Sequence, residues 1–292
     1  MYRLASSLVL WLLCVLSLSS CASTPKGLLE ESVQSTRRVV NRGHFPFQGE
    51  RLSFDVRHVA TRTTLAEASI QVGHVRQMPD GTPFIPITGG ASSLALARLF
   101  AKIDNRVEAY LDPDSWETIY SFKQLNENGR DRKFYVWFWH DEMSASVERH
   151  HAGNVAKRDY VLPPGTMDSI VWIYALRQTK LEPGKTYRWY TFDGWTLNRV
   201  GVSVLGEEDV WTPLGFFHCQ KLRIMRERSE ALQPQGALSG VFIEPGRKIE
   251  VETYELATAW LATNEARTPV RFVVETGLGE FDLLLREISQ AQ

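Results

Sequence analysis

The sequence has little of several features that would point to a function class. Its 292 residues include only three cysteines, and 33 Lys and Arg nearly balance 34 Asp and Glu, for a formal net charge of −1. This balance creates no strong field for a polyanion, so no nucleic-acid partner is predicted. An apolar run from Leu8 to Leu18 is too short to cross a bilayer as a permanent helix.

The first twenty residues have the composition of an export signal. Arg3 precedes the apolar run, and the run ends in Leu18-Ser19-Ser20 directly before Cys21. A charged start, a short apolar core and small residues before the cleavage point are typical of such signals. The ending also resembles the lipobox of bacterial lipoproteins. That resemblance implies cleavage before Cys21 and acylation of Cys21 with lipid chains such as palmitate; the alternative is an ordinary signal peptide with Cys21 as a plain thiol.

The residue after Cys21 bears on which membrane holds the chain. In the Gram-negative sorting pattern that the lipobox implies, an Asp at this position would retain the protein at the inner membrane. The chain has Ala22, which favours anchoring at the periplasmic face of the outer membrane. Residues 22–26 are predicted to form a flexible tether, and residues 28–42 a short amphipathic helix, with Gly43 as its stop.

The remaining cysteine has no intrachain partner in the lipidated protein. Cys14 is removed with the signal and Cys21 is acylated, which leaves Cys219 within the apolar stretch FFHCQKLRI. No disulfide is therefore predicted, and Cys219 is interpreted as a buried, unreactive thiol.

Beyond residue 45 the apolar pattern has a period of two, as in RLSFDVRHV, where Leu52, Phe54 and Val56 alternate with polar residues. Such alternation is typical of half-buried strands, and short turn motifs such as Asp193-Gly194 between them favour antiparallel pairing. Two segments are predicted to be helical: Ser92–Lys102 and, as the principal helix, Thr166–Gln178 with Thr166 or Asp168 as its cap. The tract 229–245 is predicted to be a long loop. The predicted strands are Arg51–Val59, Leu65–Val75, Pro83–Thr88, Arg106–Leu111, Trp116–Gln124, Arg132–Trp139, Ser144–Arg149, Lys157–Leu162, Lys185–Phe192, Asn198–Leu205, Phe216–Arg228, Arg247–Tyr254, Val270–Glu275 and Glu280–Glu287.

Four stretches together resemble the family of domain of unknown function 3108, found in exported bacterial proteins. They are FQGERLSFDV, DNRVEAYLDPDSWETIYS, PPGTMDSIVWIYALR and AWLATNEARTPVRF, which begin at Phe47, Asp104, Pro163 and Ala259. The resemblance covers residues 45–288 and implies a β-rich exported domain, without any activity or catalytic residue to transfer. Asn264 stands where the family's last motif usually has an acidic residue, so no carboxylate role is carried over there.

Two polar groups could carry chemistry. The first is His140-Asp141-Glu142 with Glu148 and His150-His151, which could ligate a transition metal; a solvated hairpin tip is the preferred interpretation, so no metal or other cofactor is predicted. The second is Asp168-Ser169, an acid beside a hydroxyl. Neither a Gly-x-Ser-x-Gly elbow nor a suitably placed His accompanies it, so helix capping explains it better than catalysis.

Tryptophan is the most unusual component of the chain. In YVWFWH, Trp137 and Trp139 fall on one strand face, with Val136 and Phe138 on the other. A strand that is apolar on both faces either lies between layers or lines a cavity. Trp137 and Trp139, together with Trp172 of the principal helix, are therefore the candidate ligand-binding residues.

The predicted fold class is mainly β: a strongly curved antiparallel sheet or incomplete β-barrel with one principal helix packed against its concave side. Residues 1–20 are predicted to be the signal peptide, residues 21–44 the lipidated Cys, tether and short helix, and residues 45–288 a single domain.

Three functions stay open on these patterns. The favoured one is a non-catalytic periplasmic lipoprotein, not an enzyme, that binds an apolar or amphiphilic envelope component. The second is a scaffold lipoprotein that docks another envelope protein, and the third is a hydrolase. A cavity walled by Trp and Phe would favour the first, a flat exposed apolar patch the second, and a converging acid, base and nucleophile the third.

Overall fold

The computed structural model describes residues 45–290, except for 96, 100, 229–251, 277 and 278. Cys21, the predicted tether, the helix expected at 28–42 and the loop expected at 229–245 lie outside the described residues.

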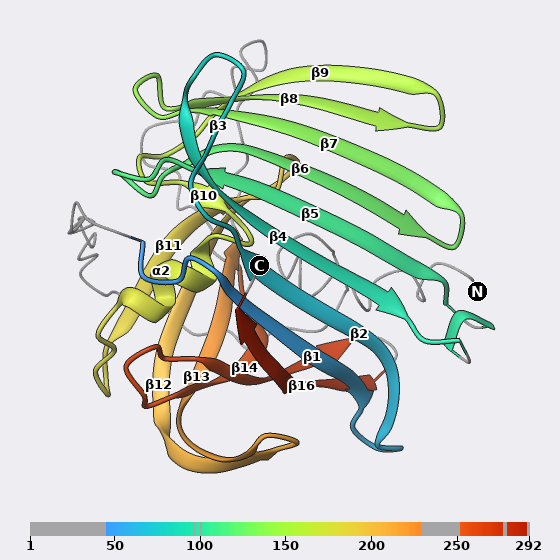
Figure 1. Ribbon diagram of the computed structural model, residues 1–292, viewed down its shortest axis with the longest axis vertical. Coiled ribbons are helices and arrows are strands. Elements are labelled where there is room, and N and C mark those ends of the chain that lie inside the picture. Colours follow the sequence, from blue (N-terminus) through green and yellow to red (C-terminus); the bar gives the residue numbers. More distant parts are fainter. Residues whose placement is uncertain (1–44, 96, 100, 229–251, 277–278, 291–292) are drawn as a thin grey trace.

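Strands dominate the described part of the chain (Figure 1). Its helices are the short 3₁₀ helix η2 (Ala97–Leu99) and the α-helix α2 (Trp172–Gln178). The strands are β1 (Glu50–His58), β2 (Thr63–Val72), β3 (Arg76–Gln77), β4 (Pro83–Ser93), β5 (Ile103–Leu111), β6 (Thr118–Glu127), β7 (Arg130–Trp139), β8 (Ser144–His151), β9 (Asn154–Val161), β10 (Met167–Asp168), β11 (Thr186–Phe192), β12 (Leu197–Thr212), β13 (Gly215–Arg228), β14 (Glu252–Ala262), β15 (Pro269–Thr276) and β16 (Gly279–Gln290).

The strands form one continuous sheet in the order β10-β11-β12-β13-β14-β15-β16-β1-β2-β4-β5-β6-β7-β8-β9, with β3 paired to β4. Neighbouring strands are antiparallel, apart from the short parallel pair of β10 and β11. The last strand, β16, pairs with the first, β1, which places both ends of the domain in the middle of the sheet. The edges are β9 and β10, so the sheet does not close on itself.

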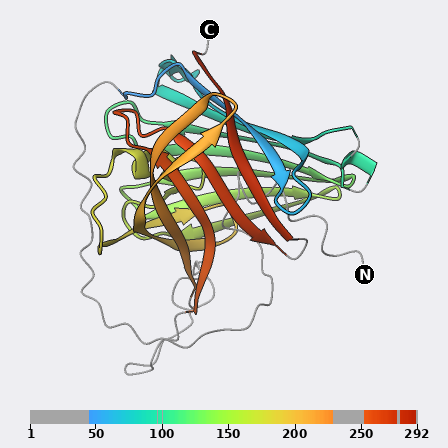
Figure 2. The same cartoon turned by 90° about the horizontal axis from the view of Figure 1, so that it is seen from below.

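The sheet curls so strongly that its two halves face each other. In Figure 2 the orange and red strands near the C-terminus cross over the green strands of the other half. One cluster of buried apolar side chains joins β1, β2, β4 and β5 to β12–β16 and α2 across this interior. A second joins Val136 and Phe138 of β7 to Phe192 and Leu197 beyond it. The predicted curved antiparallel sheet with one principal helix packed against it is therefore confirmed.

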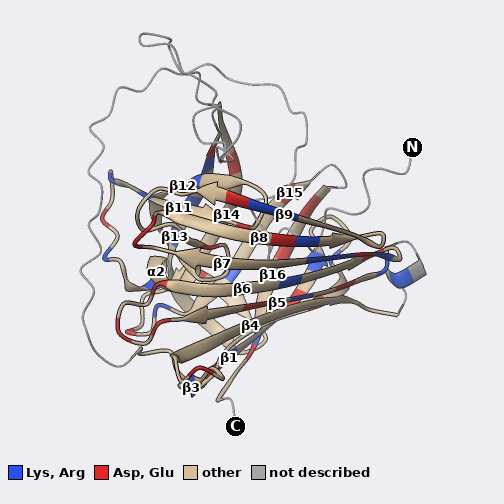
Figure 3. Cartoon of the chain, turned by 90° about the horizontal axis from the view of Figure 1, so that it is seen from above, with Lys and Arg blue, Asp and Glu red and all other residues tan. Residues whose placement is uncertain are grey.

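The apolar residues whose alternation predicted the strands are the ones that are buried in the sheet's interior. In β5, for example, Ile103, Val107 and Leu111 are buried, whereas Asp104 and Arg106 on the opposite face are exposed. Because successive side chains of a strand point to opposite faces, one apolar residue in every two suffices to cover one side of the sheet. Charges of both signs lie side by side along the outer strands β8 and β9 (Figure 3).

The helices differ most from the prediction. The helix expected over Thr166–Gln178 begins only at Trp172, because Met167 and Asp168 pair with β11 as a strand and Asp168 is engaged by the core. Its N-cap residue is Val171, which makes no side-chain capping bond. In the segment expected to be helical from Ser92, β4 continues to Ser93 and only η2 is helical.

Two strands also extend beyond their predicted ends. β12 continues past Leu205 to Thr212, through a bulge at Gly206 and the acidic run that follows it. β14 was expected over Arg247–Tyr254 but runs from Glu252 to Ala262, and it includes the buried Trp260. In both cases the long partner β13 supplies the backbone pairing that the local sequence does not signal.

Candidate functional site

Helix α2 lies against the concave side of the sheet, and the side-chain contacts of Arg177 hold its last turn in place. The fully buried guanidinium of Arg177 forms two hydrogen bonds with the Glu50 carboxylate, Nη1 to Oε1 at 2.5 Å and Nη2 to Oε2 at 2.6 Å. It also donates to the carbonyl of Ala266 and lies 3.9 Å above the ring centre of Phe47. These contacts tie the helix to the start of β1 and to the β14–β15 turn.

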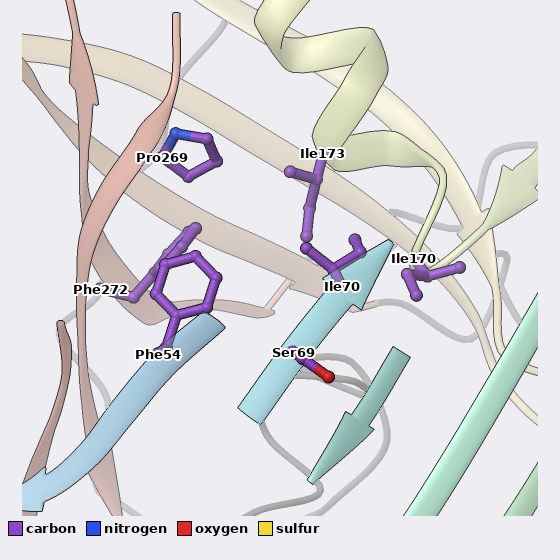
Figure 4. Close-up of a pocket in the computed structure, with 7 residues that line it drawn as sticks. All are labelled: Phe54, Ser69, Ile70, Ile170, Ile173, Pro269 and Phe272. Atoms are coloured by element: carbon purple, nitrogen blue, oxygen red, sulfur yellow. The ribbon is translucent and has the colours of Figure 1, made fainter. Parts of the chain in front are cut away.

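An apolar pocket opens beside the first turn of this helix (Figure 4). Ile170 and Ile173 form the helix side, and the sheet side comes from three strands: β1, β2 and β15. The side chains that line it are Phe54, Ser69, Ile70, Ile170, Ile173, Pro269 and Phe272. Its free volume is about 20 Å³, so in this state the pocket is nearly closed by its own side chains.

The lining restricts what the pocket can hold. Six of the seven residues are apolar, and the hydroxyl of Ser69 is the one side-chain polar group among them. An aliphatic or aromatic group would lose contact with water here without leaving a charged group of the protein unpaired. The side chains that line the pocket include no acid and no base.

The three predicted ligand-binding tryptophans do not lie together. Trp172 is 2% exposed in the main core on α2, whereas Trp137 and Trp139 are 37% and 49% exposed on the outer face of β7. Val136 and Phe138 are the residues of that strand that face the interior. The three rings therefore do not line one cavity, and a ligand-binding role for each of them stays a prediction.

The two outer tryptophans belong to a larger aromatic surface. Rings of Phe84, Tyr110, Tyr120 and Trp137 follow one another across β4 to β7, with centroid separations of 4.2, 5.2 and 5.5 Å. We call these four residues the outer aromatic stripe. Trp139 lies two residues beyond Trp137 and donates its indole N–H to Ser146 Oγ at 3.4 Å. Burial raises the pKa of Tyr120 to about 12, so its hydroxyl stays neutral.

Asp168 and Ser169 are buried together with Lys123, a residue that the sequence pattern did not single out. Lys123 Nζ on β6 is 2.9 Å from Asp168 Oδ2 and donates to Ser169 Oγ at 3.0 Å; the side chains of Lys123 and Asp168 are 1% and 0% exposed. The other oxygen of Asp168 accepts the amide of Ile170 at 2.9 Å. Asp168 thus satisfies an amide before the helix, as capping would require, but its main partner is a lysine from a distant strand.

A second buried carboxylate lies near this lysine. Asp193 Oδ1 accepts the backbone amides of Trp195 and Thr196, each at 2.7 Å. Burial raises the pKa of Asp193, although the positive charges of Lys123 and Arg226 partly oppose this effect. Lys123 shares a face of β6 with the buried Ser121 and Leu125, and this spacing of two was the available sequence signal for its inner position.

The histidine-rich group divides between the two ends of one hairpin. The β7–β8 turn contains His140, whose Nε2 lies 2.8 Å from the carbonyl oxygen of Thr118. At the opposite end of β8, His150 Nε2 lies 2.6 Å from Glu148 Oε1, and Lys157 pairs with the same carboxylate. Within the residues described, no group of three or more potential metal ligands gathers at one point.

Cys219 and Asn264 have structural surroundings. The thiol of Cys219 is fully buried and donates to the carbonyl of Phe217, and burial raises its pKa to about 12, as expected for an unreactive thiol. The side-chain oxygen of Asn264 accepts the amide of Thr268, so it closes the β14–β15 turn without needing a carboxylate. No helix in the described ranges has the length and apolar character to cross a membrane.

This curled, unclosed antiparallel sheet, with an apolar pocket beside α2, defines a class of β-rich protein. The chain belongs to the family described as "Protein of unknown function (DUF3108)", whose model matches residues 53–286. The resemblance noted in the sequence is thereby confirmed. No curated protein matches the chain.

Three solved structures are similar to this chain. A β-barrel-like protein of domain of unknown function DUF1849 from Brucella abortus is 8% identical, with 84% of this chain and 99% of that chain covered and a TM-score of 0.48. A protein described as a candidate lipoprotein from Parabacteroides distasonis is 11% identical, with coverages of 83% and 95% and a TM-score of 0.29. A candidate exported protein with a YmcC-like fold from Bacteroides fragilis is 10% identical, with coverages of 83% and 96% and the same TM-score.

Proposed function

We propose that this protein is a lipid-anchored envelope protein that binds an apolar or amphiphilic envelope component without catalysis. Cys21 carries the anchor, at the periplasmic face of the outer membrane, and the ligand enters the apolar pocket beside α2. The observation that carries the binding proposal is the lining of that pocket by six apolar side chains and Ser69.

The chemistry of the lining selects the ligand class. An acyl chain matches the aliphatic wall of Ile70, Ile170 and Ile173 and the rings of Phe54 and Phe272. Each buried methylene of such a chain contributes about 0.8 kcal/mol, so even a short buried segment stabilises the complex. Ser69 neighbours Ile70 on β2, so its hydroxyl points to the other face of the sheet, and the wall that the ligand meets is apolar.

Entry of a ligand requires the pocket to widen, because its present free volume is about 20 Å³. We expect the side chain of Ile173 to move when the pocket widens. It lies on the first turn of α2 and is only partly buried, whereas the last turn is held by Arg177. Rotation of this side chain away from the wall opens the pocket without breaking the Arg177–Glu50 pair.

The contacts of the buried Ser169 and Lys123 support a function without catalysis. Ser169 accepts a hydrogen bond from Lys123, but the Lys123 ammonium is buried and ion-paired with Asp168. A lysine in this state cannot take up the proton of a serine nucleophile, because it already carries its own.

The test is saturable binding of a fatty acid such as dodecanoate by the chain from residue 22 onward, followed by displacement of an environment-sensitive apolar dye. Ile173→Ala should strengthen binding or raise its rate, because it widens the pocket. Ile119→Ala, also at a partly buried isoleucine but outside the lining, is the matched control and should leave binding unchanged. A folded protein that shows no saturable binding, with Ile173→Ala no different from the parent, would contradict the proposal.

A second candidate function, the scaffold, is favoured by the outer aromatic stripe and Trp139. Partly exposed Tyr and Trp rings on a sheet face are typical of protein docking surfaces, where large rigid rings contribute most of the affinity. We infer that a partner protein of the envelope would dock there. A photo-reactive amino acid at position 139 should then form one discrete crosslinked product in cells, whereas the same probe at exposed Val155 on the edge strand should not.

A further inference from the structure

The hairpin that joins β12 to β13 ends in a cluster of exposed apolar side chains. Trp211 and Phe216 are directly paired across the hairpin, and Leu214 lies in the turn between them. Their exposed fractions are 55%, 77% and 46%. We call these three residues the hairpin tip; the hairpin projects at one end of the molecule (Figure 1).

The tip is rigidly presented. The side chain of Thr212 is buried and bonds both sides of the turn: its hydroxyl accepts the amide of Leu214 at 3.0 Å and donates to the carbonyl of Gly215 at 3.2 Å. Gly215 has φ = +112°, a conformation that favours glycine. Below the tip, Val210 and Cys219 anchor the hairpin in a small apolar cluster with Trp260. Exposed apolar rings held in one conformation need no further ordering before they bind.

Polar side chains begin one step below the tip. On the same face, Asp209 lies two residues before Trp211 and is paired across the hairpin with His218, whose Nδ1 is 2.8 Å from Asp209 Oδ1. Two residues of a strand span about 7 Å. That depth corresponds to the roughly 5–10 Å by which apolar groups enter the boundary between lipid headgroups and acyl chains. The position of the charges therefore limits insertion to the interfacial region.

The number of residues between Cys21 and the domain limits how far the tip can lie from a bilayer that holds Cys21. Residues 22–44 separate Cys21 from the domain, and a chain of this length spans at most about 80 Å. A domain of this size has a radius of gyration of about 18 Å, so a connection of this length is long enough for the tip to contact the anchoring membrane. Tethering turns a weak contact into an intramolecular one, with an effective concentration in the millimolar range.

We propose that the hairpin tip inserts Trp211, Leu214 and Phe216 into the interface of the bilayer that holds the lipid anchor. This inference rests on the anchoring part of the proposed function. Trp and Phe are well suited to this position, because their rings are amphipathic or apolar and lie at the level of the headgroups. A convex tip enters a soft bilayer without the matching groove that a protein partner would need, and the acidic stem with Glu207 and Asp209 favours lipids without net negative charge.

The experiment uses the unacylated chain from residue 22 onward, so that binding does not depend on Cys21, and phosphatidylcholine vesicles at millimolar lipid. The double variant Trp211→Ser/Phe216→Ser should bind at least tenfold more weakly than the parent, because each large side chain contributes about tenfold when buried. The matched control, Val155→Ser/Val161→Ser, removes two exposed apolar residues of the edge strand β9 and should bind as the parent does.

A second measurement follows insertion directly. An environment-sensitive fluorophore on Leu214→Cys should shift to the blue with vesicles, whereas the same label on Val155→Cys should not. Equal vesicle binding by parent and double variant, no binding by the parent, or no shift at position 214 would each overturn the inference. Loss of membrane fractionation on replacing Cys21 tests the anchor alone, so failure of the anchor and failure of the tip are told apart.

Discussion

Arg177 of α2 and Glu50 at the start of β1 form a bidentate ion pair in which the arginine side chain is fully buried. The two residues are 127 positions apart in the chain, so the pair closes a long loop of the fold at one point. Because the same guanidinium also contacts Phe47 and the Ala266 carbonyl, one side chain joins the helix to the first strand and to the β14–β15 turn.

Arg177→Ala should destabilise the domain by about 3–5 kcal/mol, since it leaves the Glu50 carboxylate without its partner. Urea unfolding of parent and variant measures the difference. Arg286, whose partners Asp55 and Glu67 are more exposed, is the matched control, and Arg286→Ala should cost at most about 1 kcal/mol. Equal effects of the two substitutions would show that the Arg177 pair does not hold the helix.

Trp172→Ala should cost about 3–5 kcal/mol, because it removes a large side chain from the main core beneath α2. Trp139→Ala, at the exposed end of β7, should change the free energy of unfolding by less than about 0.5 kcal/mol. A small effect at Trp172 would mean that the core collapses around the missing ring, or that the helix is not part of the folded unit.

Asp193 predicts a specific pH dependence. Its pKa is raised by burial, so the folded state favours the protonated acid. The sign follows: the stability associated with this group is fully present below its unfolded pKa and is lost as the pH rises through the folded pKa. Asp193→Asn keeps an oxygen for the amides of Trp195 and Thr196 but cannot ionise. The variant should therefore gain stability relative to the parent as the pH increases from 4 to 8.

The control for that experiment is an acid whose pKa is shifted in the opposite direction. The exposed Asp80 has a pKa lowered by the amide and hydroxyl of Thr82, so its contribution is present above the unfolded pKa and is lost as the pH falls. Relative to the parent, Asp80→Asn should lose stability as the pH increases. If the difference between parent and Asp193→Asn is independent of pH, Asp193 does not titrate differently in the folded and unfolded states.

Most of the fold could be predicted because its signal is local. Residues 51–56 alternate strictly, and β1 forms there with Leu52, Phe54 and Val56 buried. The inner face of β7 was harder to predict. Alternation puts Trp137 and Trp139 on one face and Val136 and Phe138 on the other, but it does not say which pair faces the core. The neighbouring strand holds the answer: Val136 lies opposite Val147, whereas Trp137 lies opposite Ser146. Cross-strand partners share a face, so the apolar and polar sets of β8 identify the inner face of β7.

The first residue of α2 could not be predicted from the local sequence, because contacts with distant strands determine it. Thr166-Met-Asp-Ser has the composition of a helix start, but Lys123 on β6 binds Asp168 and β11 pairs with Met167 and Asp168. Lysine is seldom fully buried, so composition gives no reason to expect Lys123 as the inner partner of Asp168. The pocket beside α2 likewise gathers residues from β1, β2, β15 and the helix, which no spacing in the sequence brings together.

Cys21→Ser should abolish acylation and release the protein from membrane fractions, because no helix among the described residues is long and apolar enough to hold it there. Cys219→Ala is the matched control: its thiol is buried within the domain, so membrane fractionation should not change. Persistent outer-membrane fractionation of Cys21→Ser at wild-type levels would contradict the lipid anchor, or would require a tight protein partner.

Trp137→Leu and Trp139→Leu distinguish the two candidate binding surfaces. Both rings lie on the outer face, whereas the pocket beside α2 opens on the concave side, so the substitutions should leave dodecanoate binding unchanged. They should instead weaken docking at the outer aromatic stripe, measured as loss of the crosslink from a probe placed at the flanking Ser146. Leu keeps much of the apolar area but loses the flat ring and the indole N–H that Trp139 donates to Ser146, so folding should be affected by less than about 1 kcal/mol. Weaker dodecanoate binding in either variant, with the thermal unfolding curve unchanged, would move the ligand from the pocket to the outer face.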